Sequence, residues 1–171
     1  YSTCRKYRTF EYKEMKRYAY LLLLIACSLL GCEPDDICLA ETPGTPQLII
    51  VFYDKANPNT KKEVLDLQVK DMGSDALIHN GTTDSIALPL KTKELSTSFF
   101  LTKIENSVSY NETLTLNYDT YDSFISRACG YKTNFTKLVY DPLNSASWIE
   151  GVIIVTDSIS DIKTTHVKIL H

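Results

Sequence analysis

The feature that most constrains the fold of this chain is a succession of short segments with β-strand patterning. In residues 113–119 (TLTLNYD), leucine and tyrosine alternate with threonine and asparagine, and residues 63–71 (EVLDLQVKD) alternate in the same way. Residues 47–54 (QLIIVFYD) are almost entirely apolar. Alternation with a period of two predicts a half-buried strand, and a short apolar run between turn signals predicts a central one.

The predicted strands follow one another at short intervals, which decides the fold class. Turn signals such as residues 57–62 (NPNTKK) separate them, and no long helical period occurs after residue 46. We therefore predict an all-β fold: an antiparallel β-sandwich of immunoglobulin-like architecture, preceded by a cleaved signal helix. The Cys, Trp, Cys order of a true immunoglobulin domain is absent, because Trp148 follows Cys129. The other predicted strands are residues 85–90, 98–104, 123–132, 135–141, 148–157 and 165–170.

Three local signals refine this prediction. Asn-Gly within residues 79–82 (HNGT) is the dipeptide most typical of a two-residue hairpin turn. Pro89 has no backbone N–H to donate, so the strand at residues 85–90 is expected at a sheet edge or a bulge. Residues 105–112 (ENSVSYNE) are expected to be a connection between two strands.

An apolar run near the start of the chain has the properties of a signal peptide. It extends over thirteen residues, from Ala19 to Gly31, and follows the positive pair Lys16 and Arg17. A transmembrane helix needs about 20 apolar residues, so the run is too short to span a bilayer. A buried core helix is the alternative, but no amphipathic pattern or cap supports it. We expect translation to begin at Met15, which places residues 1–14 upstream of the signal.

The end of this run resembles a bacterial lipobox, the signal that is read by the lipoprotein signal peptidase. Leu29-Leu30-Gly31-Cys32 carries the resemblance. It implies that Cys32 is diacylated, freed by cleavage before its amine, and acylated again, which gives a stable lipid anchor. The expected organisation is residues 1–31 as upstream residues and signal peptide, 32–46 as a lipid-anchored tether, and 47–171 as the β-sandwich domain.

The distribution of charge agrees with an exported chain. Of the 18 Lys and Arg residues six lie in residues 1–31, and of the 21 Asp and Glu residues two lie there. The remainder therefore holds 12 basic and 19 acidic residues, a net charge of −7. A basic start before an acidic body is typical of a secreted protein. The acidic body has no basic stripe, which argues against a nucleic-acid partner.

The cysteines point to one disulfide bond. Removal of the signal peptide eliminates Cys4 and Cys27, and the lipid occupies Cys32. Cys38 and Cys129 then form an even pair, which predicts a disulfide in an oxidising compartment. Two unpaired buried thiols are one alternative. A catalytic Cys129 is another, for which no histidine is placed locally.

The sequence contains no recognisable catalytic or metal-binding motif. The spacing of His79, His166 and His171 matches no metal site, and no nucleophile elbow or phosphate-binding glycine loop is present. Trp148 and the tyrosines are interpreted as core residues in preference to a ligand platform. We therefore predict no metal, no cofactor and no enzymatic activity.

Two further resemblances concern export and modification. Glu33, Asp35 and Asp36 follow Cys32 closely and resemble the acidic surface-export signal of lipoproteins of the Bacteroidota. A plain solvated tether is the alternative. Asp84-Ser85-Ile86 and Asp157-Ser158-Ile159 resemble the O-glycosylation tripeptide of the same group. Ser85 and Ser158 are therefore possible O-glycosylation sites.

The whole mature chain resembles an uncharacterised lipoprotein family of the Bacteroidota. The resemblance rests on the lipobox and on the ordered segments ICLAETPGTPQLIIVFYD, DSIALPL, SRACGYK, WIEGV and HVKILH. The resemblance implies a cellular location and a fold, but it does not imply an enzymatic activity. We expect a protein that is lipid-anchored to the outer membrane, on its periplasmic face or at the cell surface.

These features favour a non-enzymatic function in the cell envelope. The expected role is a binding or structural accessory module, whose partners are membrane lipid through acylated Cys32 and an envelope protein or glycan. The alternative is a fimbrillin-like surface assembly subunit, although the chain is short for one. An envelope hydrolase is the least favoured alternative, because no catalytic set is evident.

Overall fold

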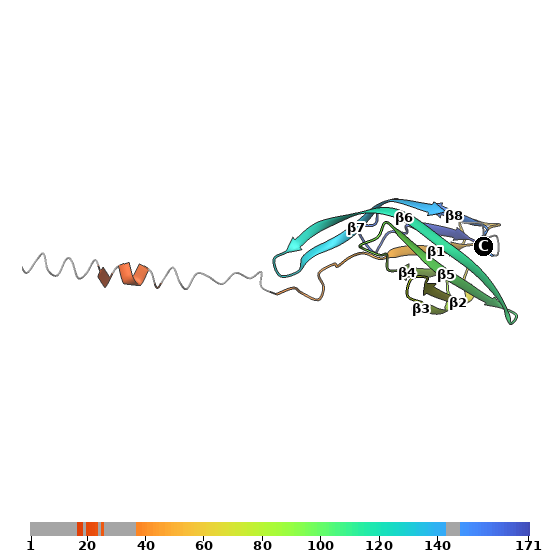
Figure 1. The fold of residues 1–171 in the computed structure, drawn as a ribbon, viewed down its shortest axis with the longest axis horizontal. Helices are drawn as coiled ribbons and strands as arrows, with labels where there is room; N and C mark the ends of the chain where they lie inside the picture. The colour runs from red at the N-terminus through yellow and green to blue at the C-terminus, as the bar shows by residue number, and fades with distance from the viewer. Residues whose placement is uncertain (1–16, 19, 24, 26–36, 143–147) are drawn as a thin grey trace, which may run out of the picture. The chain divides into compact units, whose positions relative to one another are not determined.

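The computed structural model describes residues 17, 18, 20–23, 25, 37–142 and 148–171 (Figure 1). The chain forms two compact units, Tyr1–Cys38 and Leu39–His171, and all the strands belong to the second. The described residues between 17 and 25 are helical. No helix within the described ranges is long and apolar enough to cross a membrane. Met15, Cys32 and the acidic residues after Cys32 lie outside the described residues.

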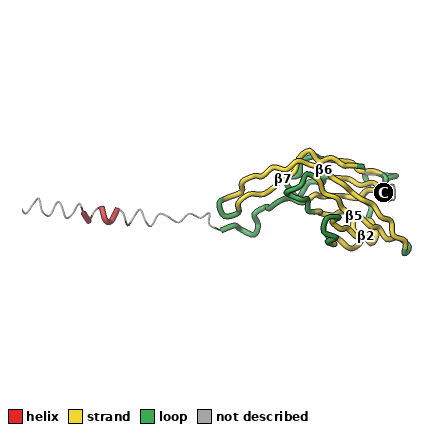
Figure 2. The backbone as a smooth tube through the Cα atoms, viewed as in Figure 1, coloured by secondary structure: helices red, strands yellow, loops and turns green. Residues whose placement is uncertain are grey.

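Two sheets make up the second unit. One has the strand order β4-β1-β9-β8 and the other has the order β3-β2-β5-β6-β7. Figure 2 shows how strands dominate this unit. The strands are β1 (Leu48–Tyr53), β2 (Val64–Asp71), β3 (Leu77–Thr83), β4 (Ser85–Leu88), β5 (Ser96–Glu105), β6 (Val108–Ser126), β7 (Gly130–Asp141), β8 (Gly151–Ile154) and β9 (Val167–Leu170).

The core lies between the two sheets, where the alternation in the sequence puts apolar side chains. In the five-stranded sheet, Phe99 of β5 and Leu116 of β6 are fully buried. In the four-stranded sheet, Ile50 and Phe52 of β1 and Ile169 of β9 are fully buried in the same cluster. The prediction of an all-β sandwich is therefore confirmed, and Trp148 and Tyr118 are core residues as expected. The same interpretation is wrong for Tyr110, Tyr121 and Tyr131, which are exposed.

The strand order has one element that the sequence did not predict. β1 pairs with β4 in the antiparallel sense and with β9 in the parallel sense, with Ile50 opposite Val167. β1 thus lies between two neighbours, which explains its nearly continuous apolar sequence. β4 is an edge strand that ends just before Pro89, as predicted. The run of neighbours β5-β6-β7 differs from the strand order of an immunoglobulin domain.

The predicted hairpin turn at residues 79–82 is wrong. Asn80 and Gly81 lie inside β3, where Gly81 has a φ of 141° and pairs with Leu67 of β2. The register shifts beside this pair, and Asp66 of β2 has a φ of 44° there. Glycine suits this bulge because it adopts positive φ without strain. The chain turns instead at residues 72–76.

The expected connection at residues 105–112 is also much shorter than predicted. Only Asn106 and Ser107 lie between β5 and β6, with φ angles of 52° and 65°. Positive φ at both central residues is the signature of a type I′ turn, which matches the twist of a β-hairpin. Glu105 and Val108 are the last pair before the turn.

The predicted strand at residues 123–132 is a hairpin. β6 continues to Ser126, residues 127–129 turn, and β7 begins at Gly130, whose φ is 72°. Cys129 therefore lies in the turn, where its N–H donates to Ser126 Oγ at 3.0 Å. A turn of three residues within a period-two pattern leaves the pattern almost unbroken, which is why the sequence suggested one strand.

The β5–β6 turn provides a test of this fold. Ser107→Gly should raise the free energy of unfolding by about 0.5–1 kcal/mol, because glycine removes the cost of positive φ. Ser109→Gly is the matched control: Ser109 lies in β6 at extended φ, so glycine there should lower stability by a similar amount. Urea unfolding followed by circular dichroism measures both. The same sign for the two variants would contradict the turn assignment.

Candidate functional site at the β6–β7 arm

The β6–β7 hairpin extends past the other strands, as Figure 1 shows. We call residues 121–133 the arm, since the described ladder of these residues joins only β6 to β7. The core-side face of the whole β6–β7 hairpin carries two aromatic pairs in series, of which the second belongs to the arm. Tyr118 and Phe135 are buried and meet edge to face, with ring centroids 5.2 Å apart. Phe124 and Tyr131 meet in the same way at 5.4 Å, but they lie beyond the core.

The outer aromatic pair is the most exposed apolar feature of the arm. Phe124 is 58% exposed and Tyr131 is 69% exposed. The two residues are direct cross-strand partners, so their contact stabilises the hairpin. Much of both rings nevertheless remains in water. Exposed aromatic rings that are held on a rigid strand pair are typical of surfaces that meet a partner.

Side-chain hydrogen bonds hold the arm in its extended form. Thr133 Oγ1 donates to Asp122 Oδ1 at 2.7 Å on one face, and Asn134 Nδ2 donates to Ser123 Oγ at 2.8 Å on the other. The segment just before β1 also contacts the arm: the N–H of Thr133 donates to Thr45 Oγ1 at 3.2 Å. The outward edge of β7 is therefore partly occupied by residues that precede β1.

Cys38 and Cys129 form a disulfide bond. The sequence prediction of this pair is confirmed, and the two alternatives, free thiols and a catalytic Cys129, are wrong. The bond closes a loop of about 90 residues and joins the tether to the turn at the end of the arm. The structure also shows where the bond lies: Cys129 is in a turn, whereas the sequence predicted it in a strand.

Removing this bond should destabilise the fold. The chain-entropy model gives a loss of roughly 4–5 kcal/mol in the free energy of unfolding for the variant Cys38→Ser with Cys129→Ser. Urea unfolding of the oxidised protein and of the variant measures the loss. Reduction of the wild-type protein should reproduce it and should leave the variant unchanged. A wild-type protein that is indifferent to reduction would contradict the bond.

A hollow of about 830 Å³ lies between the tether and the loop that precedes β9. Lys132 and Lys163 contribute cationic side chains to its wall. Asp161, also in the wall, accepts from the N–H groups of Lys163 and Thr164, and these bonds hold the pKa of its carboxyl below the usual range. The volume is in the range of ligand sites. Its lining is Glu41, Pro43, Gly44, Thr45, Pro46, Gln47, Lys132, Ser160, Asp161, Ile162, Lys163 and Thr164.

A second hollow, of about 570 Å³, lies where β7 bulges against β6. Lys137 has a φ of 54° at the register shift and pairs with Asp119 at 2.7 Å. Tyr118 forms part of the wall, and its hydroxyl donates to the backbone oxygen of Lys91 at 2.9 Å. Burial raises the pKa of this hydroxyl. The tyrosine is therefore a neutral structural group under ordinary conditions.

The two serines of the suggested O-glycosylation tripeptides differ in accessibility. Ser85 begins β4, is half-buried, and its Oγ donates to Asp84 Oδ1 at 2.9 Å. Ser158 is exposed and lies in the segment between β8 and β9. Glycosylation of either remains a prediction, and exposure favours Ser158.

The histidines lie in or next to strands, and they are not grouped at a common site. His79 lies in β3 and not in a turn. His166 is buried, and its Nδ1 accepts from the N–H of Ile49 at 2.9 Å, which ties the start of β9 to β1. Within the described ranges, no three His, Cys, Asp or Glu side chains are grouped to hold a metal ion.

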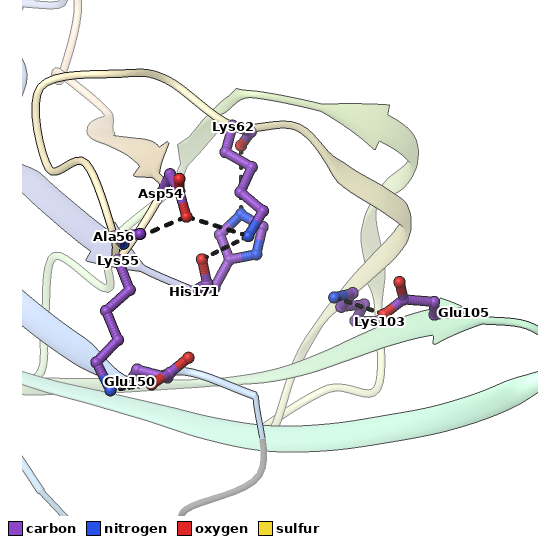
Figure 3. A network of polar contacts seen from close by, with 8 residues as sticks. All are labelled: Asp54, Lys55, Ala56, Lys62, Lys103, Glu105, Glu150 and His171. Carbon is purple, nitrogen blue, oxygen red and sulfur yellow. Dashed lines mark hydrogen bonds and ion pairs between the residues drawn. The ribbon is translucent and has the colours of Figure 1, made fainter.

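His171 belongs to a polar network at the end of β1 (Figure 3). Its Nε2 lies 3.3 Å from the backbone oxygen of Lys62, and Lys62 Nζ donates to the backbone oxygen of His171 at 2.9 Å. Lys62 also pairs with Asp54 at 3.4 Å, and Lys55 pairs with Glu150. Most of these charges are exposed, so each pair contributes little to stability. The network fastens the segment after β9 to the β1–β2 connection.

The buried histidines should make stability depend on pH. Burial lowers the pKa of His166 and of His171 below the usual 6.5. The unfolded chain therefore binds more protons than the folded chain near and below that value. The free energy of unfolding should be highest above about pH 6.5 and should fall as the pH drops below it. Urea unfolding at several pH values measures this dependence.

His166→Asn is the matched variant for this prediction. Asparagine Oδ1 can take the place of Nδ1 as acceptor for Ile49 but does not titrate in this range. The variant should lose part of the pH dependence and keep the part that comes from His171. His79→Asn, at a histidine of β3 that is only half-buried, is the control for the substitution itself. An unchanged slope for His166→Asn would contradict the assignment.

Comparison with known proteins identifies the family. The model of a family of unknown function (DUF6452) matches residues 66–171. The chain belongs to this family. The match begins inside β2 and extends through β9, so it contains the arm and Cys129, whereas Cys38 and the tether precede it. Neither the curated proteins nor the solved structures contain a match to the chain.

The sequence prediction missed the arm and its aromatic pair. Phe124 and Tyr131 were placed in one strand, on either side of Cys129. One signal was present: Gly130 follows the cysteine and takes the positive φ that a hairpin turn requires. A glycine in the middle of a strand pattern is a reason to test for a turn there.

Proposed function

We propose that this member of the DUF6452 family is a lipid-anchored lipoprotein of the cell envelope that acts as a non-enzymatic binding or structural accessory module. The observation that carries the proposal is Leu29-Leu30-Gly31-Cys32 at the end of a thirteen-residue apolar run. A positive pair stands before the run, and an acidic, polar segment follows it. This order is typical of a lipoprotein signal.

The disulfide supports the proposed compartment. Cys38 comes six residues after Cys32 and is bonded to Cys129. Disulfides persist in oxidising compartments such as the periplasm or the cell surface and are rare in the bacterial cytosol. The proposed location is therefore the outer membrane, with the domain on its periplasmic face or at the cell surface.

The contacts made by the histidine and aspartate side chains support a non-enzymatic role. His166 accepts a backbone hydrogen bond, His171 packs its ring edge against Phe52 and Trp148, and Asp161 stabilises its own loop. Each has a structural task that leaves it poorly placed for general acid–base catalysis. The hollow beside the tether offers a surface for an envelope protein or a glycan.

Lipidation of Cys32 is the direct test. Cys32→Ala should abolish incorporation of labelled palmitate and release the protein from the membrane fraction, because the thiol that takes the diacylglyceryl group is gone. Cys27→Ala is a matched control in the same apolar run and should retain both properties. Palmitate labelling and fractionation measure the result. Labelled Cys32→Ala protein would refute the anchor.

The non-enzymatic role needs a separate test. The purified, lipidated protein should not turn over envelope polysaccharides or peptidoglycan. Turnover that disappears in Lys132→Ala or Asp161→Asn, two changes in the wall of the larger hollow, would overturn this part of the proposal. Binding of the same polymers without turnover would support it.

A further inference from the structure

We propose that the end of the arm docks on the surface of the lipid bilayer, with Phe124 and Tyr131 at the boundary between headgroups and acyl chains. This inference rests on the proposed lipidation of Cys32, which supplies the membrane. It adds a second, non-covalent contact and thereby an orientation of the domain on the membrane. Three observations carry it.

The first observation is the chemistry of the arm's end. Phe124 and Tyr131 expose most of their rings on one face of a rigid hairpin. A phenyl ring and a phenol suit the membrane interface, because one part of such a pair is apolar and the other is able to meet water. Ile37 and Leu39, on either side of Cys38 in the chain, are also exposed. Exposed apolar side chains thus lie next to Cys38 in the chain, and Tyr131 lies two residues after Cys129.

The second observation is the length of the covalent path from the anchor to the arm. Cys38 comes six residues after Cys32, and this segment spans at most about 20 Å. The disulfide adds a Cα–Cα distance of about 6 Å to reach Cys129. Tyr131 is two residues further on. A lipid chain on Cys32 therefore keeps the end of the arm within a few tens of ångströms of the bilayer.

This short path makes even a weak contact effective. A tethered group meets the surface at a high effective concentration, so two aromatic rings are enough to populate the docked state without strong affinity of their own. The same limit on distance does not hold for the opposite end of the domain. Val108, at the other end of β6, lies sixteen residues from Phe124, or about 50 Å along the strand.

The third observation is the charge of the tether. Glu33, Asp35 and Asp36 lie between the anchor and Cys38. Anionic lipid repels these acids and attracts Arg127 and Lys132 of the arm, so the net effect of charge does not by itself account for docking. Burial of apolar surface is the source. The contact should therefore form on zwitterionic lipid and should persist at high salt.

The experiment uses the full lipidated chain in vesicles of phosphatidylethanolamine and phosphatidylcholine. Phe124→Trp introduces a reporter of similar shape at an exposed position. Val108→Trp is the matched control, because Val108 is also exposed and lies at the far end of the same strand. The native Trp148 is buried in the core and gives the constant background. Emission and its quenching by lipids with brominated acyl chains are measured for both variants.

The expected result is a shift of the added Phe124→Trp emission to shorter wavelength and its quenching by brominated lipid, with neither effect for Val108→Trp. Co-sedimentation with the vesicles reports the anchor separately. Loss of co-sedimentation is a failure of the proposed function. Retained co-sedimentation without quenching at position 124, or equal quenching at both positions, overturns the docking inference alone.

Amide hydrogen exchange supplies a second measurement on the unaltered chain. Residues 127–129, the turn of the arm, should exchange more slowly in vesicles than in detergent solution. Phe124→Ser with Tyr131→Ser should lose this protection, and Val108→Ser should keep it. Protection that appears only when an envelope protein is added would assign the surface to a protein partner and would overturn docking on lipid.

Discussion

The pairing of β6 with β7 is the interaction on which the rest of the structure depends. Within the sandwich, it places Tyr118 against Phe135 and so closes one side of the core. Phe135 also bonds through its backbone to Ile159, which brings the β8–β9 connection onto the edge of the sheet. Beyond the sandwich, the same ladder continues as the arm. The core therefore fixes the direction in which Phe124 and Tyr131 project.

Residues with a strong periodic signal were predictable from the sequence. Residues 63–71 and 113–119 lie in half-buried strands, and the apolar run at 47–54 lies in the central strand β1, because burial on one or both sides leaves that pattern. The disulfide was predictable from the cysteine count together with the expectation of an oxidising compartment. The parallel pairing of β1 with β9 was not, since it joins strands more than a hundred residues apart and leaves no local mark.

The local errors have one physical origin: a turn is decided by φ angles that several residue types adopt. Asn80-Gly81 has the sequence of a hairpin turn, yet the bulge at Asp66 uses the freedom of Gly81 inside β3. Asn106-Ser107 has a weaker signal and forms the two-residue turn. The exposed aromatic pair was missed for a related reason. A periodic pattern shows that residues share a face, but it does not show whether a second sheet covers that face.

The arm needs support because a two-stranded hairpin on its own is marginally stable in water. That support is the disulfide at Cys129 and the hydrogen bond from Thr133 to Thr45, both of which come from the tether. The tether is also the segment that follows the proposed anchor at Cys32. The link that stabilises the arm is thus the link that limits its distance from the lipid. Stability of the arm and its proposed position at the membrane follow from the same covalent path.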